Sequence, residues 1–177
     1  MALNHIQLFL GGARSGKSRL AEKTAVSLLD NGQVNALIYL ATAQAKDDEM
    51  AERISYHQSS RDARWQVIEE PWHLAREITA ASKDTCILID CLTLWLSYGL
   101  CEKNESEFIK QKQQLLEALN ATPAHVILVS NEVGHGIVPL GKLSRTFVDQ
   151  SGWLNQDIAE VANRVDFVMA GCVLRIK

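Results

Sequence analysis

Eight consecutive residues near the start of the chain have the types and spacing of a phosphate-binding loop: Gly11, Gly12, Ala13, Arg14, Ser15, Gly16, Lys17 and Ser18. In such a loop the glycines let backbone N–H groups turn inward around an anionic phosphate chain. Lys17 can reach the β- and γ-phosphates, and the Ser18 hydroxyl can ligate Mg²⁺. An apolar run precedes the loop and a helical run follows it, which is the context that the pattern requires. The chain is therefore predicted to bind a nucleoside triphosphate.

Acidic residues close two later apolar runs. Asp90 follows residues 86–89, and an acidic residue in this position commonly holds Mg²⁺ beside a phosphate loop, directly or through water. A helix cap or a surface turn is the alternative interpretation of Asp90. Glu132 ends residues 126–131 in the same way, as a second metal or base group or as a structural part of the loop. His135, in that loop, is a candidate ligand contact, because functional residues favour loops.

A polar segment, residues 42–61, offers a third group of reactive side chains. Arg53 and His57 are four residues apart and share a helix face, which Arg61 extends by another turn. Arginine presents a fork of donors to phosphate, and histidine can act as acid, base or nucleophile. Spacing alone favours a solvated polar face over a catalytic one.

The elements that position these residues alternate along the chain. Strands are predicted at residues 6–10, 36–41, 65–68, 86–89, 125–129 and 167–173, and helices at residues 17–29, 47–59, 72–81, 105–119 and 143–163. Near-continuous apolar strands separated by helices indicate an α/β fold, a parallel sheet covered on both faces. Ligands of such sheets bind beyond the carboxyl ends of the strands. The 177 residues are expected to form a single nucleotide-binding domain, residues 1–177.

The composition narrows the class of partner. The net charge is −3, which indicates neither nucleic acid nor an anionic membrane surface. No apolar run is long enough to span a bilayer, and the first residues lack a leader pattern, so a cytoplasmic protein is expected. The four cysteines, Cys86, Cys91, Cys101 and Cys172, have no metal-ligand spacing. Buried free thiols in a reducing compartment are expected.

Further stretches combine with the phosphate loop into one pattern: residues 39–43, 47–50, 53–54, His57, Arg61, Trp65, residues 69–71, 131–134, 136–139 and 147–156. In this order, over nearly the whole chain, they resemble the bifunctional adenosylcobinamide kinase / adenosylcobinamide-phosphate guanylyltransferase family of cobalamin assembly. The phosphate loop alone is generic, whereas the His57 segment and the loop at residues 131–139 are distinctive.

The resemblance implies a RecA-like P-loop NTPase fold, assembled as a homo-oligomer, a trimer. It also implies a corrinoid substrate and two reactions. The first phosphorylates the aminopropanol hydroxyl of adenosylcobinamide with a nucleoside triphosphate, ATP or GTP. The second transfers GMP from GTP to that phosphate, with release of pyrophosphate, through a GMP–histidine intermediate.

The same resemblance implies roles for individual residues. His57 stands at the position of the guanylylated histidine. The nucleotide contacts correspond to the phosphate loop and to Ala41, Thr42, Ala43, Gln58, Ser59, Ser60, Arg61, Glu69 and Asp90. Arg53 and Arg61 are expected to stabilise charge that develops on the phosphate, and Ser18 and Asp90 to hold Mg²⁺.

The chain departs from the family pattern at three positions. Tyr56 precedes His57 where some relatives carry a second histidine, Asp62 stands where proline is common, and Asp90 where glutamate is frequent. Two other functions remain alternatives: a phosphate-loop kinase of another small molecule without nucleotidyl transfer, and a nucleotide-gated binding module. A covalent nucleotide on the protein would separate the first alternative from the family's chemistry.

Overall fold

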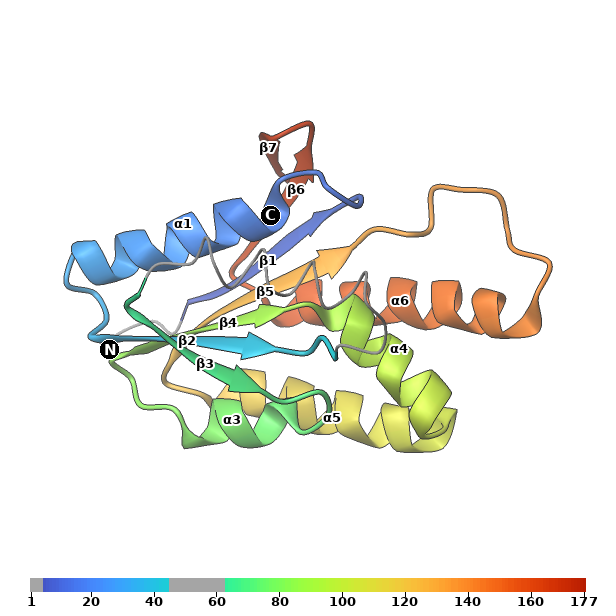
Figure 1. Ribbon diagram of the computed structural model, residues 1–177, viewed down its shortest axis with the longest axis horizontal. Coiled ribbons are helices and arrows are strands. Elements are labelled where there is room, and N and C mark those ends of the chain that lie inside the picture. Colours follow the sequence, from blue (N-terminus) through green and yellow to red (C-terminus); the bar gives the residue numbers. More distant parts are fainter. Residues whose placement is uncertain (1–4, 45–62) are drawn as a thin grey trace.

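The structure is a computed structural model, and it describes residues 5–44 and 63–177. A seven-stranded sheet in the order β3-β2-β4-β5-β1-β6-β7 forms its centre (Figure 1). Only the β6–β7 pair is antiparallel among these described strands. The strands are β1 (Ile6–Gly11), β2 (Ala36–Ala41), β3 (Trp65–Glu69), β4 (Thr85–Asp90), β5 (His125–Asn131), β6 (Arg164–Met169) and β7 (Cys172–Arg175). This confirms the mostly parallel α/β sheet predicted from the sequence.

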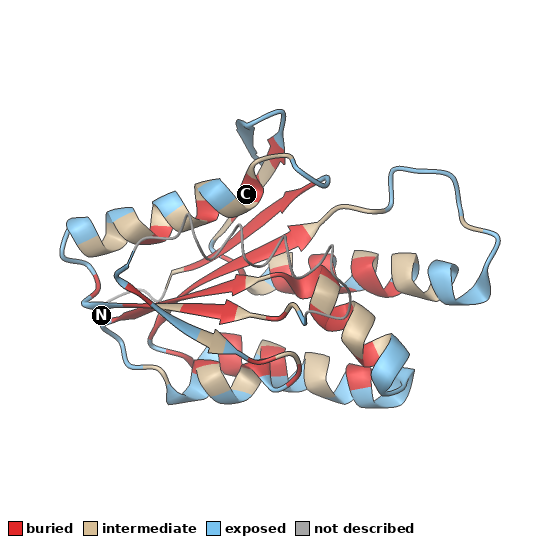
Figure 2. Ribbon diagram, viewed as in Figure 1, coloured by how far each residue is buried: buried red, intermediate tan, exposed pale blue. Residues whose placement is uncertain are grey.

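Helices cover both faces of the sheet (Figure 1). Helix α1 (Lys17–Asp30) packs on one face through Ala21 and Ala25. The other face carries four helices: α3 (Leu74–Ala80), α4 (Leu92–Glu102), α5 (Glu105–Ala121) and α6 (Lys142–Val161). Figure 2 shows buried residues along the strands and exposed residues on the outer sides of the helices.

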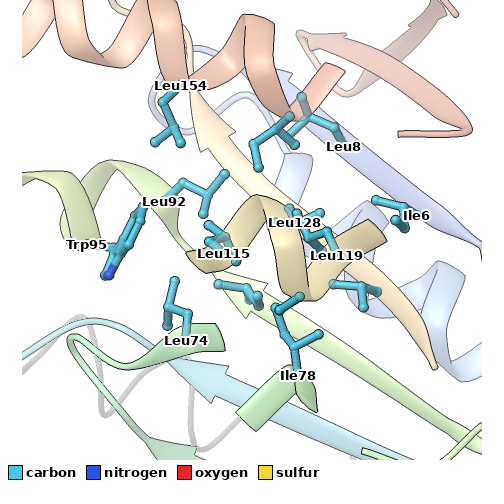
Figure 3. Packing of buried hydrophobic residues seen from close by; sticks show 14 of the residues in the cluster. Ile6, Leu8, Leu74, Ile78, Leu92, Trp95, Leu115, Leu119, Leu128 and Leu154 are labelled. Atoms are coloured by element: carbon cyan, nitrogen blue, oxygen red, sulfur yellow. The ribbon is translucent and has the colours of Figure 1, made fainter. Parts of the chain in front are cut away.

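The two apolar layers follow from the alternation of side chains along each strand. In β4, Ile87 and Ile89 join the cluster under α3 to α6, while Cys86 and Leu88 join the cluster under α1. The larger cluster is seen in Figure 3, where Trp95 of α4 lies among leucines of neighbouring helices and strands. Its indole N–H donates to the Trp72 carbonyl at 2.9 Å, so the buried ring leaves no polar group unpaired.

The sequence located most elements, with three errors among the described residues. Helix α4 was missed, because residues 92–100 are apolar on most sides and lack an amphipathic period. The single strand predicted at residues 167–173 is wrong: Ala170 and Gly171 have positive φ and form the turn of the β6–β7 hairpin. Cys86 and Cys91 are buried as expected, but Cys101 and Cys172 are exposed. The helix predicted at residues 47–59 lies outside the described residues.

Candidate functional site

The phosphate loop occupies the turn between β1 and α1, as the spacing predicted. Gly12, Ala13 and Arg14 are exposed at its tip, and Gly16 is the N-cap of α1. Gly11 must be a glycine, because a Cβ there would lie 2.3 Å from the Val168 carbonyl oxygen of β6. The Ser15 N–H donates to the Gly12 carbonyl at 3.3 Å, which closes the turn. The helix N-terminus and the loop N–H groups therefore meet at one anion-binding position.

Lys17 is buried although it is a lysine, with an exposed fraction of 7%. Its Nζ donates to the Gly12 carbonyl at 2.9 Å, so the side chain folds back over the loop. Burial lowers the pKa of Lys17, while the nearby Cys91 and Asp90 act in the opposite direction. The ammonium is thus held at the loop beside an acidic partner.

Asp90 ends β4 next to β2 and β5, and it is half-buried. The Tyr39 hydroxyl donates to its Oδ2 at 2.9 Å, which orients the carboxylate. Asp90 and Lys17 interact electrostatically, so the predicted metal residue and the phosphate lysine share one site. The sequence did not single out Tyr39, whose place in an apolar strand gave no sign of a polar contact.

Thr42 has a role that the sequence did not reveal. Its hydroxyl donates to the Cys91 carbonyl and accepts the Cys91 N–H, both at 2.8 Å. This clamp joins the ends of β2 and β4 and uses the only proton of the hydroxyl. Burial raises the pKa of the Cys91 thiol to about 11, so that thiol stays protonated. The side chain of Thr42 therefore positions the turn after Asp90.

The sheet register gathers three further candidates at one edge. Ala41 pairs with Asp90 on one side and with Glu69 on the other, and Ala43 follows close behind. Glu69 is exposed at the end of β3. Its neighbour Glu70 is buried and accepts the N–H groups of Trp72 and His73, both at 2.9 Å.

The carboxyl end of β5 is held by Thr93, which the sequence did not single out as a site residue. The Thr93 hydroxyl accepts the backbone N–H of Asn131 at 2.8 Å and its side-chain amide at 3.1 Å. Glu132 donates its N–H to the Gly11 carbonyl at 3.1 Å, and its carboxylate accepts the Gly134 N–H at 2.6 Å. Glu132 therefore supports the loop, and His135 is exposed beyond it.

The acidic residues of the described part of the chain do not form a metal cage. No group of three or more His, Cys, Asp or Glu side chains is placed to hold a metal ion within residues 5–44 and 63–177. One carboxylate and one hydroxyl, Asp90 and Ser18, lie at the two turns of the site. Such a sparse donor set fits Mg²⁺, which usually keeps several waters and takes further oxygens from substrate phosphates.

Six of the predicted site residues lie outside the described residues: Arg53, His57, Gln58, Ser59, Ser60 and Arg61. In the part of the chain that is described, no helix has both the length and the apolarity to span a membrane.

The fold and the phosphate loop together define a RecA-like P-loop NTPase. Two solved structures have the same fold. One is an ATPase domain, with a TM-score of 0.53 and 16% identity, covering 93% of this chain and 69% of that one. The other is the flagellar accessory protein FlaH of Methanocaldococcus jannaschii, with a TM-score of 0.52 and 12% identity, covering 98% and 78%. At this identity the similarity establishes the fold alone.

The sequence identifies the family. Residues 7–176 match the model of cobinamide kinase / cobinamide phosphate guanyltransferase. The chain is 48% identical to a bifunctional adenosylcobalamin biosynthesis protein, CobP, of Pseudomonas aeruginosa over 171 residues, which is 96% of each chain. It is 39% identical to the corresponding Escherichia coli protein, CobU, over 96% of this chain and 98% of that one. The chain belongs to this family, and it is a transferase with the kinase and guanyltransferase activities that the family name states.

Proposed function

We propose that residues 11–18 bind the triphosphate of GTP or ATP for both reactions. The observation that carries this proposal is the buried Lys17, held over the loop and beside Asp90 at the carboxyl ends of β1 and β4. On nucleotide binding, the Lys17 ammonium exchanges the Gly12 carbonyl for phosphate oxygens, which carry more negative charge. Ala41, Thr42, Ala43 and Glu69 lie at the same edge of the sheet and border the nucleotide.

Mg²⁺ would be held by the Ser18 hydroxyl and the Asp90 carboxylate. When bound, the ion neutralises charge on the phosphate oxygens. Asp90 is oriented for this role by Tyr39, which occupies Oδ2 and leaves Oδ1 for an inner-sphere contact or a water. The first activity then transfers the γ-phosphoryl group to the aminopropanol hydroxyl of adenosylcobinamide, and the phosphate loop positions the donor.

The second activity runs through His57 in this proposal. A neutral His57 ring nitrogen attacks the α-phosphorus of GTP, an N–P bond forms, and the bond to the leaving pyrophosphate breaks. The phosphate oxygen of the corrinoid then attacks the same phosphorus, the N–P bond breaks, and free histidine returns. Arg53 and Arg61, four residues before and after His57 in the sequence, stabilise the developing charge. Gln58, Ser59 and Ser60 complete the nucleotide contacts.

We further propose that the enzyme acts as a cytoplasmic homotrimer. A corrinoid is large relative to a chain of 177 residues, and walls from neighbouring copies would complete its site. Sedimentation is expected to give a species of three times 19.7 kDa. A monomer with full activity would contradict this assembly.

The test is covalent labelling. The protein is incubated with α-labelled GTP and Mg²⁺, and the adduct is mapped by mass spectrometry. Label that is acid-labile and base-stable is expected on His57, and it should decrease as the pH falls below about 6.5, because the attacking imidazole must be neutral.

His57→Ala should lose the label and the guanyltransferase reaction while keeping phosphorylation of cobinamide, because the kinase step needs no covalent nucleotide. His73→Ala is the matched control, since His73 is exposed at the start of α3, and it should label like the wild type. An adduct on another residue, or a fully labelled His57→Ala protein, refutes the assignment. An unlabelled wild-type enzyme that still phosphorylates cobinamide would favour the simple kinase alternative.

A further inference from the structure

The β6–β7 hairpin lies beside the phosphate loop, although the residues that touch, Ser15 and Gly171, come from opposite ends of the chain (Figure 1). The Gly171 N–H, in the hairpin turn, donates to the Ser15 carbonyl at 2.9 Å. The two backbones touch here: a Cβ on Gly16 would lie 3.4 Å from the Gly171 Cα. At the other end of the loop, Gly11 packs against the Val168 carbonyl of β6. Both ends of the loop therefore rest on the hairpin.

The Gly171 hydrogen bond constrains one peptide group of the loop. The Ser15–Gly16 peptide is trans, so its C=O and N–H point in opposite directions. Because the Ser15 carbonyl is tied to the hairpin, the Gly16 N–H is directed away from the hairpin and toward the inside of the loop. A phosphate cradle needs its N–H groups inward and its carbonyl groups outward. The hairpin turn thus imposes the polarity that anion binding requires.

Gly171 reaches this position through its backbone conformation. Its φ is +77°, and that of Ala170 is +52°, so the turn uses two consecutive left-handed residues. Such a two-residue connection is the tight hairpin type that matches the twist of the strands. The Gly171 N–H is consequently free of the β6–β7 ladder and available to the loop.

We propose that Gly171 is a positioning residue for the phosphate loop, whose N–H preorganises the Ser15–Gly16 peptide for phosphate. This inference rests on the proposed binding of triphosphate by residues 11–18. The C-terminal hairpin would then contribute to nucleotide affinity, although all residues predicted to contact the nucleotide come earlier in the sequence.

The test replaces one N–H group by an ester oxygen and leaves every side chain unchanged. Glycolic acid is incorporated at position 171 by in vitro translation, which replaces the amide of Gly171 by an ester. The matched control is glycolic acid at position 32: Gly32 also has positive φ, +67°, and its N–H also donates to a backbone carbonyl, that of Leu29 at 3.0 Å. Gly32 lies at the opposite end of α1, away from the loop.

Loss of one organising hydrogen bond should weaken GTP binding by about three- to tenfold in the 171 ester. The 32 ester should lose a similar amount of thermal stability and bind GTP like the wild type.

The outcomes separate this inference from the assignment of the loop. Equal GTP affinity in the two esters overturns the positioning role. If Lys17→Ala also left GTP binding intact, the assignment of residues 11–18 itself would fail, and this result is independent of the two esters.

Discussion

The phosphate loop and the loop that follows β5 lie at the same edge of the sheet and differ in what holds them. The phosphate loop is held by hydrogen bonds within the chain. The Lys17 ammonium and the Ser15 N–H donate to the Gly12 carbonyl, and the Gly171 N–H of the hairpin turn donates to the Ser15 carbonyl. The projecting loop, residues 132–141, is held at its start through Glu132 and at its end by the Arg145 guanidinium, which donates to the Pro139 and Leu140 carbonyls. Its apolar side chains nevertheless lie in water: Ile137 and Leu140 have exposed fractions of 97% and 98%.

The difference is between a loop that packs against other parts of the same chain and an apolar surface that this chain leaves exposed to water. Burying a branched aliphatic side chain stabilises a structure by about 1.5–3 kcal/mol, so two side chains left in water represent unused stabilisation. Val138 and Leu143 are also largely exposed nearby. An apolar segment of this kind is typical of an interaction site, and it supports the proposed assembly.

The largest expected effect concerns the completed site. Lys17→Ala should weaken GTP binding by a factor on the order of a hundred or more, because two charge-assisted contacts to phosphate are lost. Calorimetry measures the affinity, and circular dichroism should show an unchanged fold. Lys23→Ala, on the exposed side of the same helix, is the control and should bind normally. Normal binding by Lys17→Ala would remove the phosphate loop from the mechanism.

The next effect concerns the carboxylate at the end of β4. Asp90→Asn should raise the Mg²⁺ concentration needed for half-maximal turnover about tenfold, because a neutral amide is a weaker ligand than a carboxylate. Asp84→Asn is the matched control, since Asp84 is exposed beside the opposite end of the same strand. A Mg²⁺ dependence equal to that of the wild type would make Asp90 purely structural.

The sequence predicted the position of the phosphate loop well and its supports poorly. Residues 11–18 and Asp90 lie where the pattern placed them, because a phosphate loop carries its geometry in local spacing. Thr42, Thr93 and Gly171 act through partners 38 to 156 residues away in the sequence. No local pattern encodes such pairs, since they depend on which strands become neighbours in the sheet.

The errors in the fold have a similar origin. Helix α4 is covered by α5 and α6 and is therefore apolar on most sides. It consequently lacks the alternation of apolar and polar residues, with a period of about 3.6, that identifies a surface helix in a sequence. From the local sequence, Ala170 and Gly171 look like part of one continuous apolar strand, because alanine rarely takes positive φ and so does not signal a turn. Tertiary contacts decided both cases.

A smaller effect, on stability, is expected at Glu70, the buried carboxylate that follows the end of β3. Burial alone would raise the pKa of Glu70, but the N–H groups of His73 and Trp72, with Arg76, bring it below its usual value of 4.5. Glu70→Gln should therefore lower the free energy of unfolding at neutral pH by about 1–2 kcal/mol.

The pH dependence of that loss has a definite sign. Because the folded pKa of Glu70 is the lower one, its contribution is complete above the unfolded pKa and is lost as the pH falls through the folded pKa. The difference in Tm between Glu70→Gln and the wild type should thus shrink below about pH 4.5. Glu69→Gln, an exposed neighbour, should differ little from the wild type at any pH. A constant difference across this range would contradict the role given to the carboxylate.

The smallest effect on the chain itself is expected at the projecting loop. Ile137→Ser combined with Leu140→Ser removes side chains that pack on almost nothing in one chain, so the unfolding free energy of the dissociated chain should stay within about 0.5 kcal/mol. Sedimentation should instead show the proposed trimer lost or weakened, with GTP still bound by the phosphate loop. Ile109→Ser, at a 48% exposed position on α5, is the control and should leave the assembly intact. If the double variant stays trimeric, the exposed residues of this loop do not contact a second copy of the chain. Their exposure would then be explained by binding of the corrinoid and not by assembly.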